Sequence, residues 1–115
     1  MSKKTESAKE ATASALKASE KAFASGEDKD HKAAIAAHKV AVTAHDAASG
    51  EQVAGGERVK GNRHASVAGH HINMIRAHNS ALDGTGHGGR AKEDYDRAAN
   101  WMKESTEDAK GMLFS

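Results

Sequence analysis

The sequence predicts an all-α protein, folded as an up-down-up-down four-helix bundle with helices of roughly 20 residues. The 115 residues include no proline, and 24 of the 43 apolar residues are alanine, the best helix former. Glycines fall at intervals where helices can end. Histidine and small apolar residues recur every seven residues, as they do in helices packed lengthwise. The length fits a single domain, residues 1–115, and no alternating pattern predicts a strand.

The first helix is expected over residues 7–25, after a short flexible N-terminus of residues 1–6. Ser7 and Glu10 have the spacing of a capping box at a helix start. Gly26 follows the helix, in the position where glycine commonly ends helices.

The second helix is expected from Asp28, a residue type that caps helix starts, to the residue before Gly50. A glycine-bearing linker, helical in part, is expected near residues 50–61. The third helix then covers residues 62–82.

The fourth helix is expected over residues 90–110, after a second glycine-rich linker near residues 84–89. The second linker matches the pattern G-x-G-x-x-G. A dinucleotide-binding loop with this pattern follows a strand, whereas this segment follows a predicted helix, so we interpret it as a linker.

Histidine recurs every seven residues in the second and third predicted helices. These residues are His31, His38, His45, His64, His71 and His78. The residues three and four positions later are mostly apolar, so the histidines lie in or beside the buried face of each helix. Thr12 and Ser19 occupy the equivalent positions of the first helix. These eight residues, here called the polar ladder, are predicted to be structural.

Antiparallel packing of the second and third helices predicts three facing pairs: His31 with His78, His38 with His71, and His45 with His64. The first helix is expected to bring Ser19 near His31 and Thr12 near His38. A neutral imidazole has one donor and one acceptor nitrogen, so the members of a layer can satisfy one another. Paired in this way, the polar ladder would select one register among similar alanine faces.

A metal site formed by His38, His70 and His71 is one alternative. Histidines seven residues apart on a helix are separated by about 10.5 Å along its axis, so an ion would have to join two helices. Zinc takes four ligands, or three and a water, and no carboxylate stands at a matching position. The other alternative is a pH switch, because protonating two facing imidazoles would bring like charges together.

Charge and composition limit the classes of function and partner. The 17 Lys and Arg residues are mixed with 16 Asp and Glu residues, which gives a net charge of +1 and predicts no nucleic-acid partner. No apolar run approaches the roughly 20 residues of a membrane span, and the charged N-terminus predicts no signal peptide. The sequence has no cysteine, H-E-x-x-H or G-x-S-x-G motif, so we expect neither catalysis nor a cofactor.

The end of the chain carries the residues Met112, Leu113 and Phe114, which follow Gly111. We expect them to form an exposed apolar anchor for a partner, with packing against the end of the bundle as the alternative. Trp101 occupies an inward position of the heptad and is expected in the core.

Histidine follows alanine in three short segments: Ala37-His38-Lys39, Ala44-His45-Asp46 and Ala77-His78-Asn79. Set in alanine-rich helices separated by glycines, they resemble small helical structural proteins of tailed bacteriophages, of the capsid-associated or decoration type. This resemblance covers about half of the chain and implies a virion component; without a virion, the cytoplasm is the expected location.

We therefore expect a non-enzymatic protein that acts by self-association or by docking with other structural subunits. Two alternatives remain open: a metal-binding bundle that uses its histidines, and a small phage-encoded regulatory or counter-defence protein.

Overall fold

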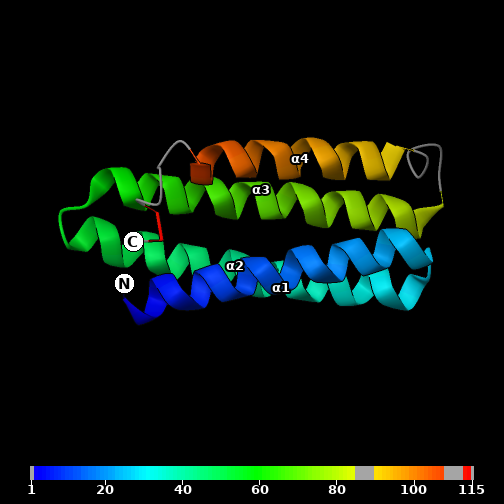
Figure 1. Ribbon diagram of the computed structural model, residues 1–115, viewed down its shortest axis with the longest axis horizontal. Helices are drawn as coiled ribbons and strands as arrows, with labels where there is room; N and C mark the ends of the chain where they lie inside the picture. Colours follow the sequence, from blue (N-terminus) through cyan, green and yellow to red (C-terminus); the bar gives the residue numbers. More distant parts are fainter. Residues whose placement is uncertain (1, 85–89, 108–112, 115) are drawn as a thin grey trace.

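The computed structural model describes residues 2–84, 90–107 and 113–114, and these residues form four helices and no strand (Figure 1). The helices are α1 (Lys3–Ser25), α2 (Asp28–Ala54), α3 (Arg58–Asp83) and α4 (Ala91–Glu107). They lie side by side along the long axis of a molecule with extents of 45 × 21 × 18 Å. The predicted all-α bundle is thus confirmed.

α1 begins earlier than predicted because Ser2 caps it. The Ser2 hydroxyl accepts a hydrogen bond from the backbone N–H of Thr5 at 3.1 Å, which satisfies a free donor of the first turn. The chain is helical from Lys3 onward. The expected flexible N-terminus of residues 1–6 is therefore wrong for its described part, and so is the capping box at Ser7.

The link between α2 and α3 is shorter than the linker expected near residues 50–61. α2 continues through Gly50 and ends at Ala54, and α3 already begins at Arg58. Gly56, with a φ of 84°, adopts the left-handed conformation that reverses the chain between them. Glycine inside a helix lowers its stability but does not end it when the helix packs lengthwise on a neighbour.

Gly61 lies inside α3 because α2 passes close to it. A Cβ atom at Gly61 would collide with the Val53 side chain and lie 3.1 Å from the carbonyl oxygen of Ser49. The Ser49 hydroxyl also donates a hydrogen bond to the Gly61 carbonyl at 2.7 Å. This glycine therefore permits helix contact and does not form a turn.

Gly26 and Gly84 follow α1 and α3 in the left-handed conformation, with φ of 69° and 62°, as the glycine pattern predicts. The expected linker over residues 84–89 lies outside the described residues from residue 85 onward. The last three residues of the fourth predicted helix also lie outside them.

Alanine occupies buried positions at regular intervals on α1 and α2, which pack on each other. At intervals of seven residues, both helices bury alanines with no exposed surface: Ala8, Ala15 and Ala22 on α1, and Ala34, Ala41 and Ala48 on α2. Such small side chains allow two helices to pack at the close end of the usual separation of roughly 8–10 Å.

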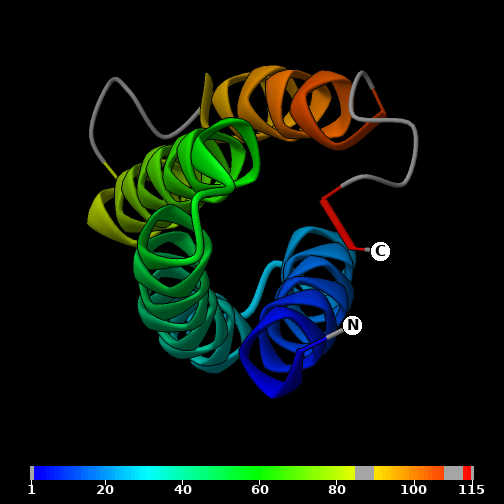
Figure 2. The ribbon, with the colours of Figure 1, turned by 90° about the vertical axis from the view of Figure 1, so that its left-hand side faces the viewer.

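The helices form an open arc when viewed along the bundle (Figure 2). α1 packs on α2, α2 on α3 and α3 on α4, with α1 and α4 at the two ends of the arc. The described C-terminal residues, Leu113 and Phe114, lie between these two ends, where Leu113 is buried and Phe114 is half-buried. Larger apolar side chains, including Met74, Tyr95 and Met102, fill the adjoining core.

Candidate functional site

Six histidines on α2 and α3 lie inside the bundle. His31 is 5% exposed, and the other five have no exposed surface. They face one another through Nδ1 atoms: His31 and His78 at 2.8 Å, His38 and His71 at 2.7 Å, and His45 and His64 at 2.9 Å. These distances are those of N–H···N hydrogen bonds. The structure brings together each pair that the heptad spacing predicts.

The hydroxyls of α1 join one histidine pair to the next. Ser19 Oγ lies 2.7 Å from Nε2 of both His38 and His78. Thr12 Oγ1 lies 2.7 Å from Nε2 of His45 and 3.0 Å from Nε2 of His71.

The expected neighbours of these hydroxyls, His31 for Ser19 and His38 for Thr12, are therefore wrong. Each hydroxyl lies between two layers and not within one, because the Nδ1 atoms within a layer already bind each other. A hydroxyl both donates and accepts, so in this position it satisfies one ring from each of two layers.

The polar ladder is a continuous path of hydrogen bonds through the bundle, with one branch from Ser19 to Tyr95. Its order is His31, His78, Ser19, His38, His71, Thr12, His45 and His64. The path extends over two heptads of α2, about 21 Å at 1.5 Å per residue. Rings of successive layers also lie close together, with centroids 5.8 Å apart for His38 and His78 and 5.7 Å for His45 and His71.

Proton counting restricts the charge of these rings. A neutral imidazole donates from one nitrogen and accepts at the other, as the interior members of the path require. A second proton turns the acceptor nitrogen of such a ring into a donor. This donor faces another donor across a histidine pair, or it makes a hydroxyl accept from both of its rings and lose the acceptor of its own O–H. Protonation of an interior ring therefore leaves at least one donor of the polar ladder without its acceptor in the buried core.

Burial acts in the same direction as the hydrogen bonds. It lowers the pKa of His38 to about 4, and the pKa of His45 to about 4 with a further contribution from His64. Burial, followed by repulsion from neighbouring histidines, lowers the pKa of both His71 and His78 to about 3. These four imidazoles are neutral at pH 7 in the folded protein.

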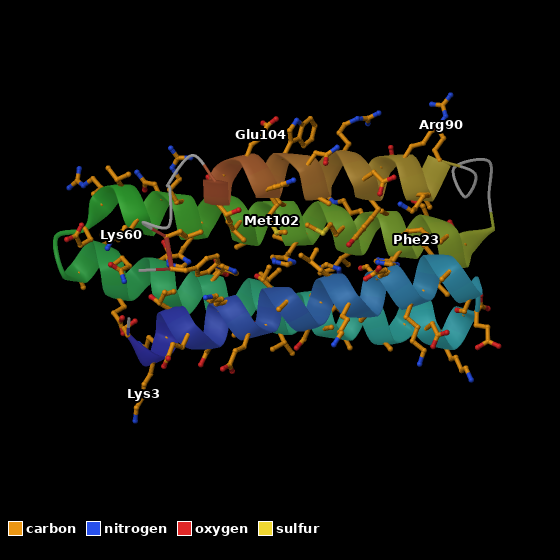
Figure 3. All side chains as sticks on the ribbon, in the orientation of Figure 1. Lys3, Phe23, Lys60, Arg90, Met102 and Glu104 are labelled. Carbon is orange, nitrogen blue, oxygen red and sulfur yellow. The ribbon has the colours of Figure 1, made fainter. Side chains whose placement is uncertain are left out.

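Aromatic rings close both ends of the polar ladder. Phe23 packs against His31 and His78, with centroid distances of 5.0 and 4.8 Å, and Figure 3 shows it pointing into the interior, as Met102 also does. At the other end, the Phe114 ring lies 6.1 Å from His45 and 6.2 Å from His64. By contrast, Lys3 and Arg90 point outward from the bundle (Figure 3).

His64 ends the path with one nitrogen unused. Among the described residues, its Nε2 is a buried side-chain polar atom without a hydrogen-bond partner. Burial lowers the pKa of His64, while the nearby Leu113 backbone and the Glu51 carboxylate act in the opposite direction. A buried polar atom without a partner is uncommon, so this nitrogen needs an explanation.

Two further residues continue the heptad beyond the predicted set. Thr5 stands seven residues before Thr12, and Gln52 stands seven residues after His45. Thr5 is buried, and its hydroxyl accepts hydrogen bonds from Gln52 Nε2 at 3.3 Å and from Ser2 Oγ at 3.0 Å. The same spacing that identifies the histidines would have found both residues.

The three histidines of the alternative metal site do not converge. His70 lies toward α4, where its Nε2 is 3.3 Å from the Ser105 hydroxyl and its ring is 6.4 Å from Trp101. The distance of 2.7 Å between His38 and His71 is also shorter than the roughly 3.3 Å between two ligands of a tetrahedral zinc ion. Nowhere in the described part of the chain do three His, Asp or Glu side chains form a metal-binding group.

Trp101 and the C-terminal residues differ from expectation. Trp101 is 49% exposed, because α4 turns Tyr95 and Met102 inward and leaves Trp101 at the surface. Leu113 is only 1% exposed and Phe114 packs on the polar ladder, so the expected exposed anchor is wrong for these two residues. They adopt the alternative arrangement, packing against the bundle; Met112 lies outside the described residues.

Comparison with known proteins gives no match, whether with family models, curated proteins or solved structures. None of the described helices has the length and apolar character needed to cross a membrane.

Proposed function

We propose that this chain is a non-enzymatic structural protein that acts through contacts with other protein subunits, and that acid disassembles it. The observation that supports the proposal is the polar ladder. All the interior rings use both nitrogens in hydrogen bonds to one another or to a hydroxyl. Groups enclosed in this way hold helices together and do not meet a substrate.

Acid sensitivity follows from the surroundings of the rings. On α2, the Asp30 carboxylate accepts a hydrogen bond from Ser25 and lies 3.8 Å from the Lys21 ammonium. Glu51, on the same helix, favours the charged form of His64, but it does not raise the pKa of His38, His45, His71 or His78. α3 adds His70, whose positive form would oppose protonation of His71.

From α4, the Tyr95 phenol faces the polar ladder, and burial raises its pKa, so it remains neutral. In the described part of the chain, no acidic group raises the pKa of His38, His45, His71 or His78. Their protonation would therefore be uncompensated and would oppose folding.

The surface around Trp101 supports a role in protein contacts. Trp101 borders a shallow hollow of about 240 Å³ between α3 and α4, which Arg76 and Arg97 also line. Exposed tryptophan and arginine are the residue types that contribute most to protein interfaces. We assign this surface to association with a further copy of the chain.

Light scattering at neutral pH tests the association. The protein should form concentration-dependent oligomers that dissociate after Trp101→Ala, whereas Val40→Ala, a change at an exposed apolar residue on α2, should leave them intact. A monomer at every concentration would contradict self-association. Co-purification with assembled phage particles would in turn support the virion component that the sequence resemblance implies.

A further inference from the structure

The continuity of the polar ladder is more than acid sensitivity requires. Separate buried histidine pairs would already make the fold acid-labile. Here Ser19 and Thr12 connect the three pairs without a break, from the 5% exposed His31 to the unused nitrogen of His64. An unbroken path of groups that each donate and accept has consequences for protons that separate pairs do not have.

Two proton orders let every interior member of the path donate to one neighbour and accept from the other. In the first, His31 donates from Nδ1 to His78, and each member donates to the next until His64 carries its proton on the unused Nε2. In the second, His64 donates from Nδ1 to His45, and every donor and acceptor is exchanged back to His31, which then carries its proton on Nε2. In both orders the two rings of each pair have opposite tautomers.

We propose that the polar ladder is a proton relay between the two ends of the bundle. In the first order, a proton from water binds His31 Nε2, and each member passes its own proton to the next. His64 then releases the proton of its Nε2, and the path is left in the second order. One proton enters and one leaves, no net charge is gained, and passage in the opposite direction restores the first order.

The heptad spacing assigns the release end of the path to α1. Ser19 pairs with His78 and Thr12 with His71, so the same seven-residue step places Thr5 opposite His64. The Thr5 hydroxyl is already bonded to the half-buried Ser2 hydroxyl at 3.0 Å. Thr5 does not bond to His64 Nε2 among the described residues, and its hydroxyl accepts from Ser2 and Gln52. We therefore assign Thr5 as the group whose hydroxyl turns toward His64 to receive its proton and then donates to Ser2.

Tautomers of the histidine rings, measured by ¹⁵N NMR at neutral pH, distinguish a relay from separate pairs. In each of the two relay orders either His31 or His64 is protonated on Nδ1, but not both, so a relay requires the two Nδ1-protonated fractions to add up to one. A sum above one would show a hydroxyl that accepts from both rings and would contradict the relay. In a relay the two orders interconvert, and all six rings show the same exchange rate. A single fixed order, or different rates for different pairs, would overturn the relay.

Cutting the path at one hydroxyl gives the sharper test. Thr12→Val leaves Nε2 of both His71 and His45 without a partner, and a buried nitrogen without a partner is less unfavourable bare than protonated. Both rings then protonate on Nδ1, which drives the two segments into opposite orders. His31 becomes Nε2-protonated, and so does His64 once Thr5 accepts from its Nε2, so the sum of their Nδ1-protonated fractions falls from one toward zero.

Ser19→Ala cuts the path on the other side of the central pair and reverses that pair. His38 should be protonated on Nδ1 after Ser19→Ala and on Nε2 after Thr12→Val, although His38 does not contact Thr12. Thr12→Ser keeps the hydroxyl and should restore the wild-type tautomers, and Ser14→Ala, at an exposed position of α1, should not change them. The same His38 tautomer in both cut variants would refute the relay. Should a cut variant fail to fold, the sum of fractions and the common exchange rate in the wild type decide the question.

Discussion

His38 and His71 face each other at the middle of the bundle with their Nδ1 atoms 2.7 Å apart. That distance fits one shared proton, so one ring donates and the other accepts. Neither ring has exposed surface, and the remaining nitrogen of each binds a hydroxyl of α1. The stability of the core therefore depends on both rings being present and uncharged.

The free energy of unfolding should fall as the pH falls below about 6.5. Histidines in the unfolded chain bind protons near the ordinary pKa of 6.5, whereas His38 and His45 do so near 4 and His71 and His78 near 3 when folded. The unfolded state thus binds more protons below pH 6.5, and stability decreases down to about pH 3. At pH 5 each ring costs about 2 kcal/mol, and together they approach the whole stability of a small domain.

Urea unfolding at pH 7.5, 6 and 5, followed by far-ultraviolet circular dichroism, measures this loss. A free energy of unfolding that stays constant between pH 7.5 and 5 would contradict it. Because only buried rings are involved, added salt should not remove the effect.

Replacing one histidine of the His38–His71 pair should lower the free energy of unfolding by more than the loss of its packing contacts alone. His38→Leu leaves Nδ1 of His71 and one side of Ser19 without a partner, at a cost of about 3 kcal/mol. Adding His71→Leu removes one of these orphaned groups, so the double variant should lose at least about 1 kcal/mol less than the sum of the two single variants. Chemical denaturation of the three variants measures this coupling, and a change at the exposed Val59 combined with His38→Leu should be additive.

Two glycines of α3 should respond oppositely to alanine. A Cβ atom at Gly61 would approach the backbone of α2, whereas one at Gly69 would meet no atom within 4 Å. Gly61→Ala should therefore lower the melting temperature, and Gly69→Ala should stabilise the helix by up to about 1 kcal/mol. Equal shifts of the same sign in calorimetry would show that the contact at Gly61 is not tight.

The C-terminal residues should stabilise the fold and not the association. Leu113→Ala empties a buried position at the end of the core and should cost about 3 kcal/mol. Trp101→Ala, at the half-exposed position on α4, should leave the unfolding free energy nearly unchanged while it weakens oligomers. Denaturation and light scattering of both variants separate these roles, and the reverse pattern would support Leu113 as the partner anchor.

Much of the fold could be predicted because a seven-residue repeat indicates which face each helix buries when helices pack along their length. The spacing of His38 and His71 from their neighbours sufficed to pair them, and Gly26 with Asp28 marked the turn between the first two helices. The prediction for Trp101 was wrong because residues 101 and 102 both lie near the apolar stripe of the heptad, about 100° apart on the helix, and the sequence pattern did not show that Met102 is the one that faces inward.

The axial position of α1 could not be predicted from the repeat. The heptad places Ser19 on the correct face but leaves its height relative to the rings undetermined. That height depends on which nitrogens remain unbonded after the Nδ1 atoms pair, a property of three helices together. The ends of α2 and α3 were missed for a related reason: Gly61 interrupts the sequence pattern, yet it is present for contact with α2.

The short links of the bundle have a consequence for how the protein folds. Gly26 and Glu27 alone join α1 to α2, and Gly55 to Glu57 join α2 to α3, so each hairpin can form locally and fast. Yet in the α2–α3 hairpin alone, four ring nitrogens lack the hydroxyl partners that α1 supplies. In the α1–α2 hairpin alone, each hydroxyl bonds to one ring in place of two. Neither intermediate is complete, and the three helices should therefore be acquired in one all-or-none transition.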